Sequence, residues 1–131
     1  MIPFSPRLNI FSVLKKKRNY WNPSNSEHQF LLSRSSWSLL VICLLRKNKS
    51  QNEKINLFLP EYFCNDPIPL LNSKIINIIY YEVDKDFKPS LKSLNKKAEI
   101  NKPDIFLCVH YFGQPIVLNE LKNFCIKHKS W

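Results

Sequence analysis

The chain has 131 residues, a formal charge of +10, 44% hydrophobic residues and 13% aromatic residues, which indicates one globular domain, or a piece of one, and excludes a disordered chain. Gly113 is the one glycine, which excludes GxGxxG dinucleotide loops, Walker A loops and GxSxG nucleophile elbows. The positive charge suits a nucleic-acid-binding module, but the basic residues are spread along the chain and the one basic run, 15–18, is short.

Residues 1–32 are predicted to form an N-terminal arm. They are polar, aromatic and interrupted by prolines, which argues against a long helix, and only 10–14 have a short helical pattern. A helix is predicted at 36–48, and we expect it to be buried on most sides because its central positions are nearly all apolar. Ser35 or Ser36 is expected to accept a hydrogen bond from the free N–H groups of its first turn.

Strands and helices are expected to alternate through the rest of the chain. Apolar and β-branched runs predict strands at 55–59, 75–83 and 104–110. Helical patterns predict a proline-initiated turn at 67–71 and amphipathic helices at 89–97 and 117–128. This alternation predicts an α/β fold, a partial parallel sheet with flanking helices. Trp131 is expected to be the first residue of a further parallel strand.

The cysteine pattern and the lengths of the apolar runs indicate the cellular compartment of the protein. Cys43, Cys64, Cys108 and Cys125 form no CxxC pair, so we expect reduced thiols and no metal site. The start of the chain has no signal-peptide pattern, and the longest apolar stretch, 37–45, is too short to cross a bilayer. We therefore expect a cytoplasmic protein with no membrane partner.

Three segments carry a resemblance to a known family. They are Ser35-Ser36-Trp37-Ser38-Leu39, Leu59-Pro60-Glu61-Tyr62-Phe63-Cys64 and Val109-His110-Tyr111-Phe112-Gly113-Gln114-Pro115. In order and spacing they resemble the Gly-Thr-x-Ala-Leu, Pro-x-Tyr-Thr-Cys and Val-His-x-x-Gly-Gln-Pro motifs of the DegT/DnrJ/StrS aminotransferases, which depend on pyridoxal 5'-phosphate. The stretch 81–84, a strand that ends in an acid, also fits. The resemblance implies that 33–131 is an incomplete fold-type-I large domain.

The resemblance implies four cofactor-binding residues. Ser35 and Ser36 would hold the phosphate at a helix N-terminus, although a plain N-cap is the alternative. Cys64 stands where the family often has an aromatic residue that stacks on the pyridine ring. His110 ends a strand at the carboxyl edge of the sheet, where it could hydrogen-bond near the cofactor or be a structural histidine. Gly113 is expected to have a positive φ.

The resemblance also implies a function for the whole enzyme. An amino group would pass from a donor such as glutamate to a keto group on a nucleotide-linked sugar, in a homodimer. The family's pyridine-binding Asp would lie on the strand that begins near Trp131, and its Schiff-base Lys further on, so no catalytic residue is assigned within this chain. We expect the chain alone to be inactive. A non-catalytic remnant and a basic nucleic-acid-binding module are the alternatives.

Overall fold

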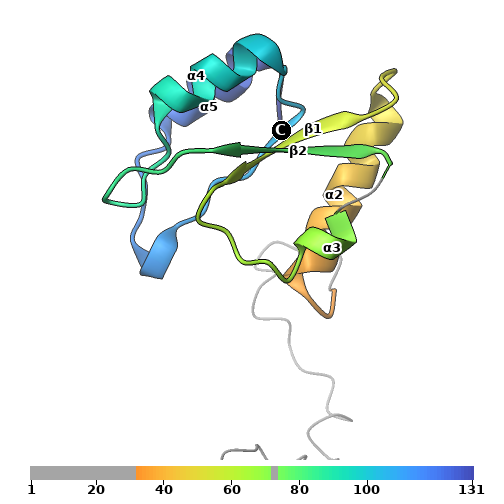
Figure 1. The fold of residues 1–131 in the computed structure, drawn as a ribbon, viewed down its shortest axis with the longest axis horizontal. Helices are drawn as coiled ribbons and strands as arrows, with labels where there is room; N and C mark the ends of the chain where they lie inside the picture. The colour runs from red at the N-terminus through yellow and green to blue at the C-terminus, as the bar shows by residue number, and fades with distance from the viewer. Residues whose placement is uncertain (1–31, 72–73) are drawn as a thin grey trace, which may run out of the picture. The chain divides into compact units, whose positions relative to one another are not determined.

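The structure is a computed structural model that describes residues 32–71 and 74–131 (Figure 1). The predicted arm, apart from residue 32, and the short helical pattern at 10–14 lie outside the described residues. The elements, in chain order, are α2 (Ser35–Lys49), β1 (Ile55–Pro60), α3 (Ile68–Leu71), β2 (Ile76–Tyr81), α4 (Leu91–Ile100), β3 (Ile105–Phe106), the 3₁₀ turn η1 (Tyr111–Gly113) and α5 (Asn119–His128).

The three strands form one parallel sheet in the order β2-β1-β3. β1 pairs with β2 from Ile55 opposite Ile76, and with β3 from Leu57 opposite Ile105. The predicted α/β fold with a partial parallel sheet and flanking helices is therefore confirmed. The helix predicted at 89–97 begins and ends a few residues later than expected, at Leu91 and Ile100.

Helices cover both faces of the sheet because the strand residues alternate between two apolar clusters. Leu57 and Leu59 of β1 pack with Leu39 and Cys43 of α2, in a cluster that also includes Leu71 of α3. The intervening Phe58 packs on the other face with residues of α4 and α5. Figure 1 shows the same arrangement, with α4 and α5 together on one side of the strands and α2 with α3 on the other.

β3 is much shorter than the strand predicted at 104–110, and Pro60 supplies the reason. The N–H of Leu107 still donates to the carbonyl of Phe58, at 3.0 Å. In a parallel ladder the next bond would run from residue 60 to the carbonyl of Leu107, but proline has no N–H. The hydroxyl of Tyr81 donates to that carbonyl instead, at 2.8 Å. The regular ladder therefore stops two residues into β3.

Trp131 occupies the position of a further strand at the outer edge of β3. Its N–H donates to the carbonyl of Asp104 at 3.0 Å, and its carbonyl accepts from the N–H of Phe106 at 2.9 Å. This pair of bonds, to the residues on either side of Ile105, is the pattern of parallel pairing. Trp131 therefore has the hydrogen bonds expected of the first residue of a further parallel strand, and the strand itself stays a prediction.

Two expectations for α2 are wrong. Its N-cap is Arg34, with no side-chain capping bond, so neither Ser35 nor Ser36 caps the first turn. The helix is also not buried on most sides, because only Leu39 and Cys43 are buried. Five of its apolar side chains are exposed: Trp37, Val41, Ile42, Leu44 and Leu45. The sheet covers a single stripe of the helix, and nothing among the described residues covers the opposite face.

No helix among the described residues is long and apolar enough to span a membrane.

Candidate functional site

The sheet has a topological switch point between β1 and β3, because the connections that follow β1 lead first to the strand on one side of it and then to the strand on the other. From β1 the chain moves to one side, through α3 to β2, and it then crosses β1 through α4 to reach β3 on the other side. In open α/β sheets, ligands bind in the crevice at the carboxyl ends of the two strands where such a switch occurs. Here the crevice lies where β1 runs into residues 61–64 and β3 runs into residues 107–111.

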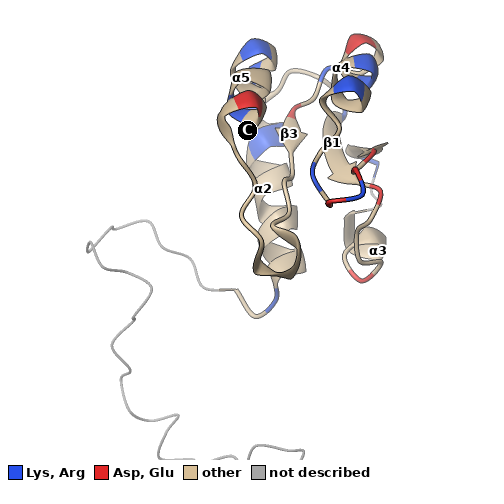
Figure 2. Cartoon of the chain, turned by 90° about the vertical axis from the view of Figure 1, so that its left-hand side faces the viewer, with Lys and Arg blue, Asp and Glu red and all other residues tan. Residues whose placement is uncertain are grey.

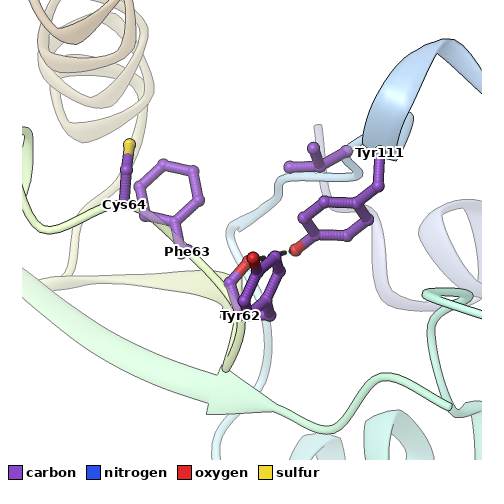
Figure 3. Close-up of a pocket in the computed structure, with 5 residues that line it drawn as sticks. Tyr62, Phe63, Cys64 and Tyr111 are labelled. Atoms are coloured by element: carbon purple, nitrogen blue, oxygen red, sulfur yellow. Dashed lines mark hydrogen bonds between the residues drawn. The ribbon is translucent and has the colours of Figure 1, made fainter. Parts of the chain in front are cut away.

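A cavity of about 410 Å³ lies at this crevice (Figure 3). It is lined by Tyr62, Phe63 and Cys64 after β1 and by Val109 and Tyr111 after β3. Its volume falls within the range of small-molecule sites, which is about 300–1,000 Å³. Two segments that are some 45 residues apart in the sequence therefore form a single site.

A hydrogen bond joins the two segments that line the cavity. The hydroxyl of Tyr111 donates to the carbonyl of Tyr62, and Figure 3 shows it pointing at that oxygen. Tyr111 begins the turn η1, which is closed by a bond of 2.9 Å from the N–H of Gln114 to the Tyr111 carbonyl. Gly113 within this turn has φ 73°, as predicted from the sequence. The turn thus fixes the ring of Tyr111 beside that of Tyr62.

Four aromatic rings gather around this edge of the sheet. Tyr62, Phe87 and Tyr111 come from the loops after β1, β2 and β3, and their ring centroids lie 5.3–5.5 Å from one another. Phe112 adds a fourth ring, 5.3 Å from that of Phe87. These separations are typical of tilted aromatic pairs, each of which contributes about 0.5–1.5 kcal/mol beyond the burial of its area.

Two members of this cluster have strained backbones. Phe87 has φ 58° and Phe112 has φ 53°, in the left-handed region that bulky side chains rarely adopt. Such a conformation costs on the order of 1–3 kcal/mol and clusters at functional sites in proteins. Phe87 was not among the site residues predicted from the sequence. The sequence nevertheless contains a signal for this cluster. Each of the three strands is followed by a loop with an aromatic residue, and the carboxyl ends of parallel strands lie at one edge of the sheet.

The cavity is an uncharged environment. Burial raises the pKa of the Tyr111 hydroxyl, and the neighbouring Cys108, Tyr62 and Cys64 raise it further. The hydroxyl therefore remains protonated at neutral pH and acts as a hydrogen-bond donor. The five lining residues include no lysine, arginine or carboxylate. Across the described part of the chain, no group of three or more His, Cys, Asp or Glu residues could hold a metal ion.

Of the four residues predicted to bind the cofactor, Cys64 lines the cavity and is exposed to solvent. His110 lies between two lining residues in the sequence but does not itself line the cavity. Its Nδ1 accepts a hydrogen bond of 3.0 Å from the N–H of Ile116, which fixes the loop. This is the bond expected of a structural histidine, and it leaves Nε2 as the nitrogen that carries the proton in the neutral ring.

Ser35 and Ser36 form the first turn of α2 and are not among the residues that line the cavity. Ser35 is exposed and Ser36 is half-buried. The N–H groups of Trp37 and Ser38 both bond to the carbonyl of Arg34, at 3.2 and 3.4 Å. The N–H groups of the two serines have no backbone partner among the described residues, as is usual in a first helical turn.

Comparison of the chain with protein-family models, with curated proteins and with solved structures gives no match.

Proposed function

We propose that this chain is the N-terminal segment of the large domain of a pyridoxal-phosphate-dependent aminotransferase of the DegT/DnrJ/StrS type. One observation carries the proposal: two segments selected by the resemblance, 59–64 and 109–115, meet at one cavity at the carboxyl edge of the sheet. The pairing of Trp131 at the outer edge of β3 is consistent with it, because the resemblance puts the pyridine-binding strand there.

The lining residues fit one part of this cofactor. Tyr62 and Tyr111 offer faces on which a planar pyridine ring can stack, and Cys64 stands where the family often has its stacking residue. Bound pyridoxal phosphate would act as an electron sink for amino-group transfer. The lining has no lysine for covalent attachment and no carboxylate for the pyridine nitrogen. We therefore assign binding and orientation to these residues, and no catalytic step.

The rest of the activity belongs to the same proposal. The complete enzyme would take an amino group from a donor such as glutamate, pass it to a keto sugar nucleotide, and work as a cytoplasmic homodimer. The proposal requires a reading frame that continues past Trp131 into an acid-containing strand and, further on, a lysine. Sequencing of the transcript tests this requirement, and an immediate stop would favour a non-catalytic remnant.

Among the described residues, the charge distribution gives no comparable support to a nucleic-acid-binding module. Figure 2 shows lysine and arginine residues on α2, α4 and α5 instead of gathered on one element. Recognition of a phosphate backbone depends on cations clustered on one face or along one helix.

Binding of pyridoxamine 5'-phosphate tests the cofactor site. This ligand has an amine in place of the aldehyde, so it cannot form Schiff bases with surface lysines. Quenching of intrinsic fluorescence during a titration should saturate in the millimolar range or below. Tyr62→Ala should weaken binding by about 3–10-fold, the equivalent of one aromatic stacking contact.

The matched control for this experiment is Tyr80→Ala. Tyr80 is an exposed tyrosine on β2 that does not line the cavity, so its loss should leave the affinity unchanged. Unphosphorylated pyridoxamine should bind more weakly if the N–H groups at Ser35 and Ser36 contribute to a phosphate site. Quenching that does not saturate, or equal weakening by both tyrosine substitutions, would contradict the proposal.

A further inference from the structure

β2 is the outer strand on the side of the sheet away from β3, and its outer edge carries unpaired backbone groups. The N–H of Glu61 donates to the carbonyl of Tyr81 at 2.8 Å, so the odd-numbered residues of β2 bond to β1. Ile76, Ile78 and Tyr80 therefore turn their N–H and C=O groups outward. None of these six groups has a hydrogen-bond partner among the described residues. Such an edge is a template for another strand.

A hollow of about 420 Å³ lies beside the end of β2, on the face that α4 covers. It is lined by Glu82, the residue after β2, and by one side of α4, with no residue from α5. The N–H of Glu82 donates to the hydroxyl of Ser93 at 3.2 Å, which holds this side of the helix next to the end of the strand. A strand added at the outer edge of β2 would therefore run alongside the hollow.

Three lysines give this side of α4 a positive charge. Lys92, Lys96 and Lys97 line the hollow, together with the single carboxylate of Glu82. Lys92 and Lys96 are exposed, and Lys97 is half-buried. None of the three forms an ion pair with a described residue. The hollow therefore favours a partner that brings negative charge.

The spacing of these lysines matches that of alternate residues in an extended strand. Because α4 connects two parallel strands, it runs back along the sheet, antiparallel to β2. Lys92 and Lys96 are four residues apart, a rise of about 6 Å along a helix axis. Alternate residues on one face of a strand are about 6.6–6.8 Å apart. Carboxylates at alternate positions of an added strand would therefore meet the two lysines in turn.

The other face of an added strand would meet apolar side chains. Ile78 packs in the cluster on the α2 side of the sheet, whereas Tyr81 packs in the cluster on the α4 side. Because the side chains of a strand alternate, Tyr80 lies on the α2 side with Ile78, and it is 38% exposed. The segment that fits this edge thus has acidic residues on one face and apolar residues on the other.

A second copy of the chain fits this edge poorly. Two copies of β2 paired edge to edge would be antiparallel and related by a two-fold axis perpendicular to the sheet. Both α4 helices would then lie on the same face of the joined sheet, and their lysines would face each other across the new pairing. Because like charges so placed repel each other, the edge favours a segment of opposite charge.

We propose that the outer edge of β2 binds an extended acidic segment of a partner protein, which adds a strand to the sheet. Carboxylates at alternate positions of the segment contact the lysines of α4, and its apolar side chains lie beside Ile78 and Tyr80. Its backbone bonds to the free N–H and C=O groups of β2. The hollow and the cofactor cavity share no lining residue, so this interaction goes beyond the proposed function.

Three dye-labelled peptides test this interaction by fluorescence anisotropy with the full chain. The first is Val-Glu-Val-Glu-Val-Glu-Val, which alternates. The second is Glu-Glu-Glu-Val-Val-Val-Val, which has the same composition and charge without alternation. The third is the first peptide N-methylated at its central Glu and at the Val after it. This change removes one donor that faces the edge, whichever way the peptide runs. The first peptide should bind roughly 5-fold or more tightly than the others, the equivalent of one hydrogen bond or ion pair.

Lys96→Glu should weaken binding of the first peptide by roughly 5-fold or more, because it reverses a charge that the peptide contacts. Lys92→Gln, a milder change, should weaken it by a smaller factor. Lys122→Glu is the matched control: it alters an exposed lysine of α5 that does not line the hollow, and it should leave the affinity unchanged. Circular dichroism checks that the three variants keep the fold of the parent chain.

Absence of saturable binding by the first peptide would overturn the proposal, and so would equal affinities for the first and third peptides. Equal weakening by Lys96→Glu and Lys122→Glu would show attraction to the whole basic chain and not to this edge. A uridine decamer that bound as tightly as the peptide and was equally sensitive to Lys96→Glu would assign the lysines to nucleic acid. Peptide binding that appeared only on dilution of the protein would show a second copy on the edge. Each of these results would overturn it.

Discussion

A guanidinium nitrogen of Arg46, near the end of α2, lies 3.4 Å from the carboxylate of Asp104, just before β3. Both side chains are largely removed from solvent, with exposed fractions of 19% and 12%. The same carboxylate accepts the N–H of Asn56 at 2.9 Å, and Arg46 also donates to the carbonyl of Lys129 at 2.9 Å. This ion pair therefore connects α2, β1, β3 and the end of α5.

Asp104→Asn should lower the free energy of unfolding by about 1–3 kcal/mol, because it leaves the Arg46 guanidinium without its counter-charge in a partly buried position. Urea unfolding followed by circular dichroism measures the change. Asp86→Asn is the control, since Asp86 pairs with Lys88 at an exposed site and its loss should change stability by less than about 0.5 kcal/mol. Equal losses from the two substitutions would contradict the structural role of Asp104.

Tyr81→Phe should destabilise the fold by about 1–2 kcal/mol at pH 7. Tyr81 is fully buried, and its hydroxyl is the donor that replaces the missing N–H of Pro60 at the Leu107 carbonyl. Its removal leaves that carbonyl without this partner. The experiment compares urea midpoints with those of Tyr80→Phe, which alters an exposed tyrosine on the same strand and should have no effect.

The cost of Tyr81→Phe should also depend on pH. Burial raises the pKa of Tyr81 well above its ordinary value, and Cys108 and Tyr111 raise it further. Above about pH 10 the unfolded chain loses a proton that the folded chain keeps, so stability falls by up to about 1.4 kcal/mol per pH unit. Phenylalanine has no such proton. The stability difference between parent and variant should therefore shrink from pH 8 to pH 11, and a constant difference would contradict this.

Alkylation rates should separate Cys43 from Cys64 by roughly 100-fold at pH 8. Burial raises the pKa of Cys43 from 9.0 to about 11, so its thiolate fraction is about a hundredth of that of an ordinary thiol. Cys43 is also fully buried, whereas Cys64 is exposed. Mass spectrometry of iodoacetamide-treated peptides measures both rates. In concentrated urea the two rates should converge, and similar rates in buffer would contradict the burial of Cys43.

The sequence was sufficient to predict the parallel sheet, because β-branched runs alternate with amphipathic ones along the chain. It was not sufficient to predict where β3 ends. The effect of Pro60 on β3 depends on the pairing of Phe58 with Phe106, and 44 residues, 61–104, separate the two strands in the sequence. Similarly, an apolar helix pattern predicted burial of α2, but periodicity does not reveal how many sides of a helix other elements cover.

The candidate site was partly predictable for a related reason. Cys64 was named because the resemblance puts the family's stacking residue at its position, and the loop after β1 brings it to the cavity. Tyr111 stood within the recognised loop, but nothing in the sequence showed that its hydroxyl bonds to Tyr62. Phe87 reaches the cluster through a left-handed backbone conformation, which residue propensities do not predict for phenylalanine.

The face of α2 that no described residue covers should drive association of the isolated chain. Ile42 and Leu45, one helical turn apart, are 41% and 52% exposed, beside three other exposed apolar residues of the helix. Contiguous apolar surface of this kind promotes contacts between molecules. The double substitution Ile42→Glu with Leu45→Lys should reduce light scattering and sedimentation of aggregates. It should leave the helical signal unchanged, because the new pair can form a favourable i, i+3 contact.

Leu39→Glu is the matched control for this last prediction, since Leu39 lies on the buried side of the same helix. An unpaired carboxylate there should abolish cooperative melting and should not reduce aggregation. Because the two variants alter opposite sides of α2, their comparison separates the effect of the exposed face from that of helix stability. The prediction would be wrong if the double variant aggregated as much as the parent chain while it kept its helical signal. Association would then originate elsewhere, with the open edge of β3 as the next site to alter.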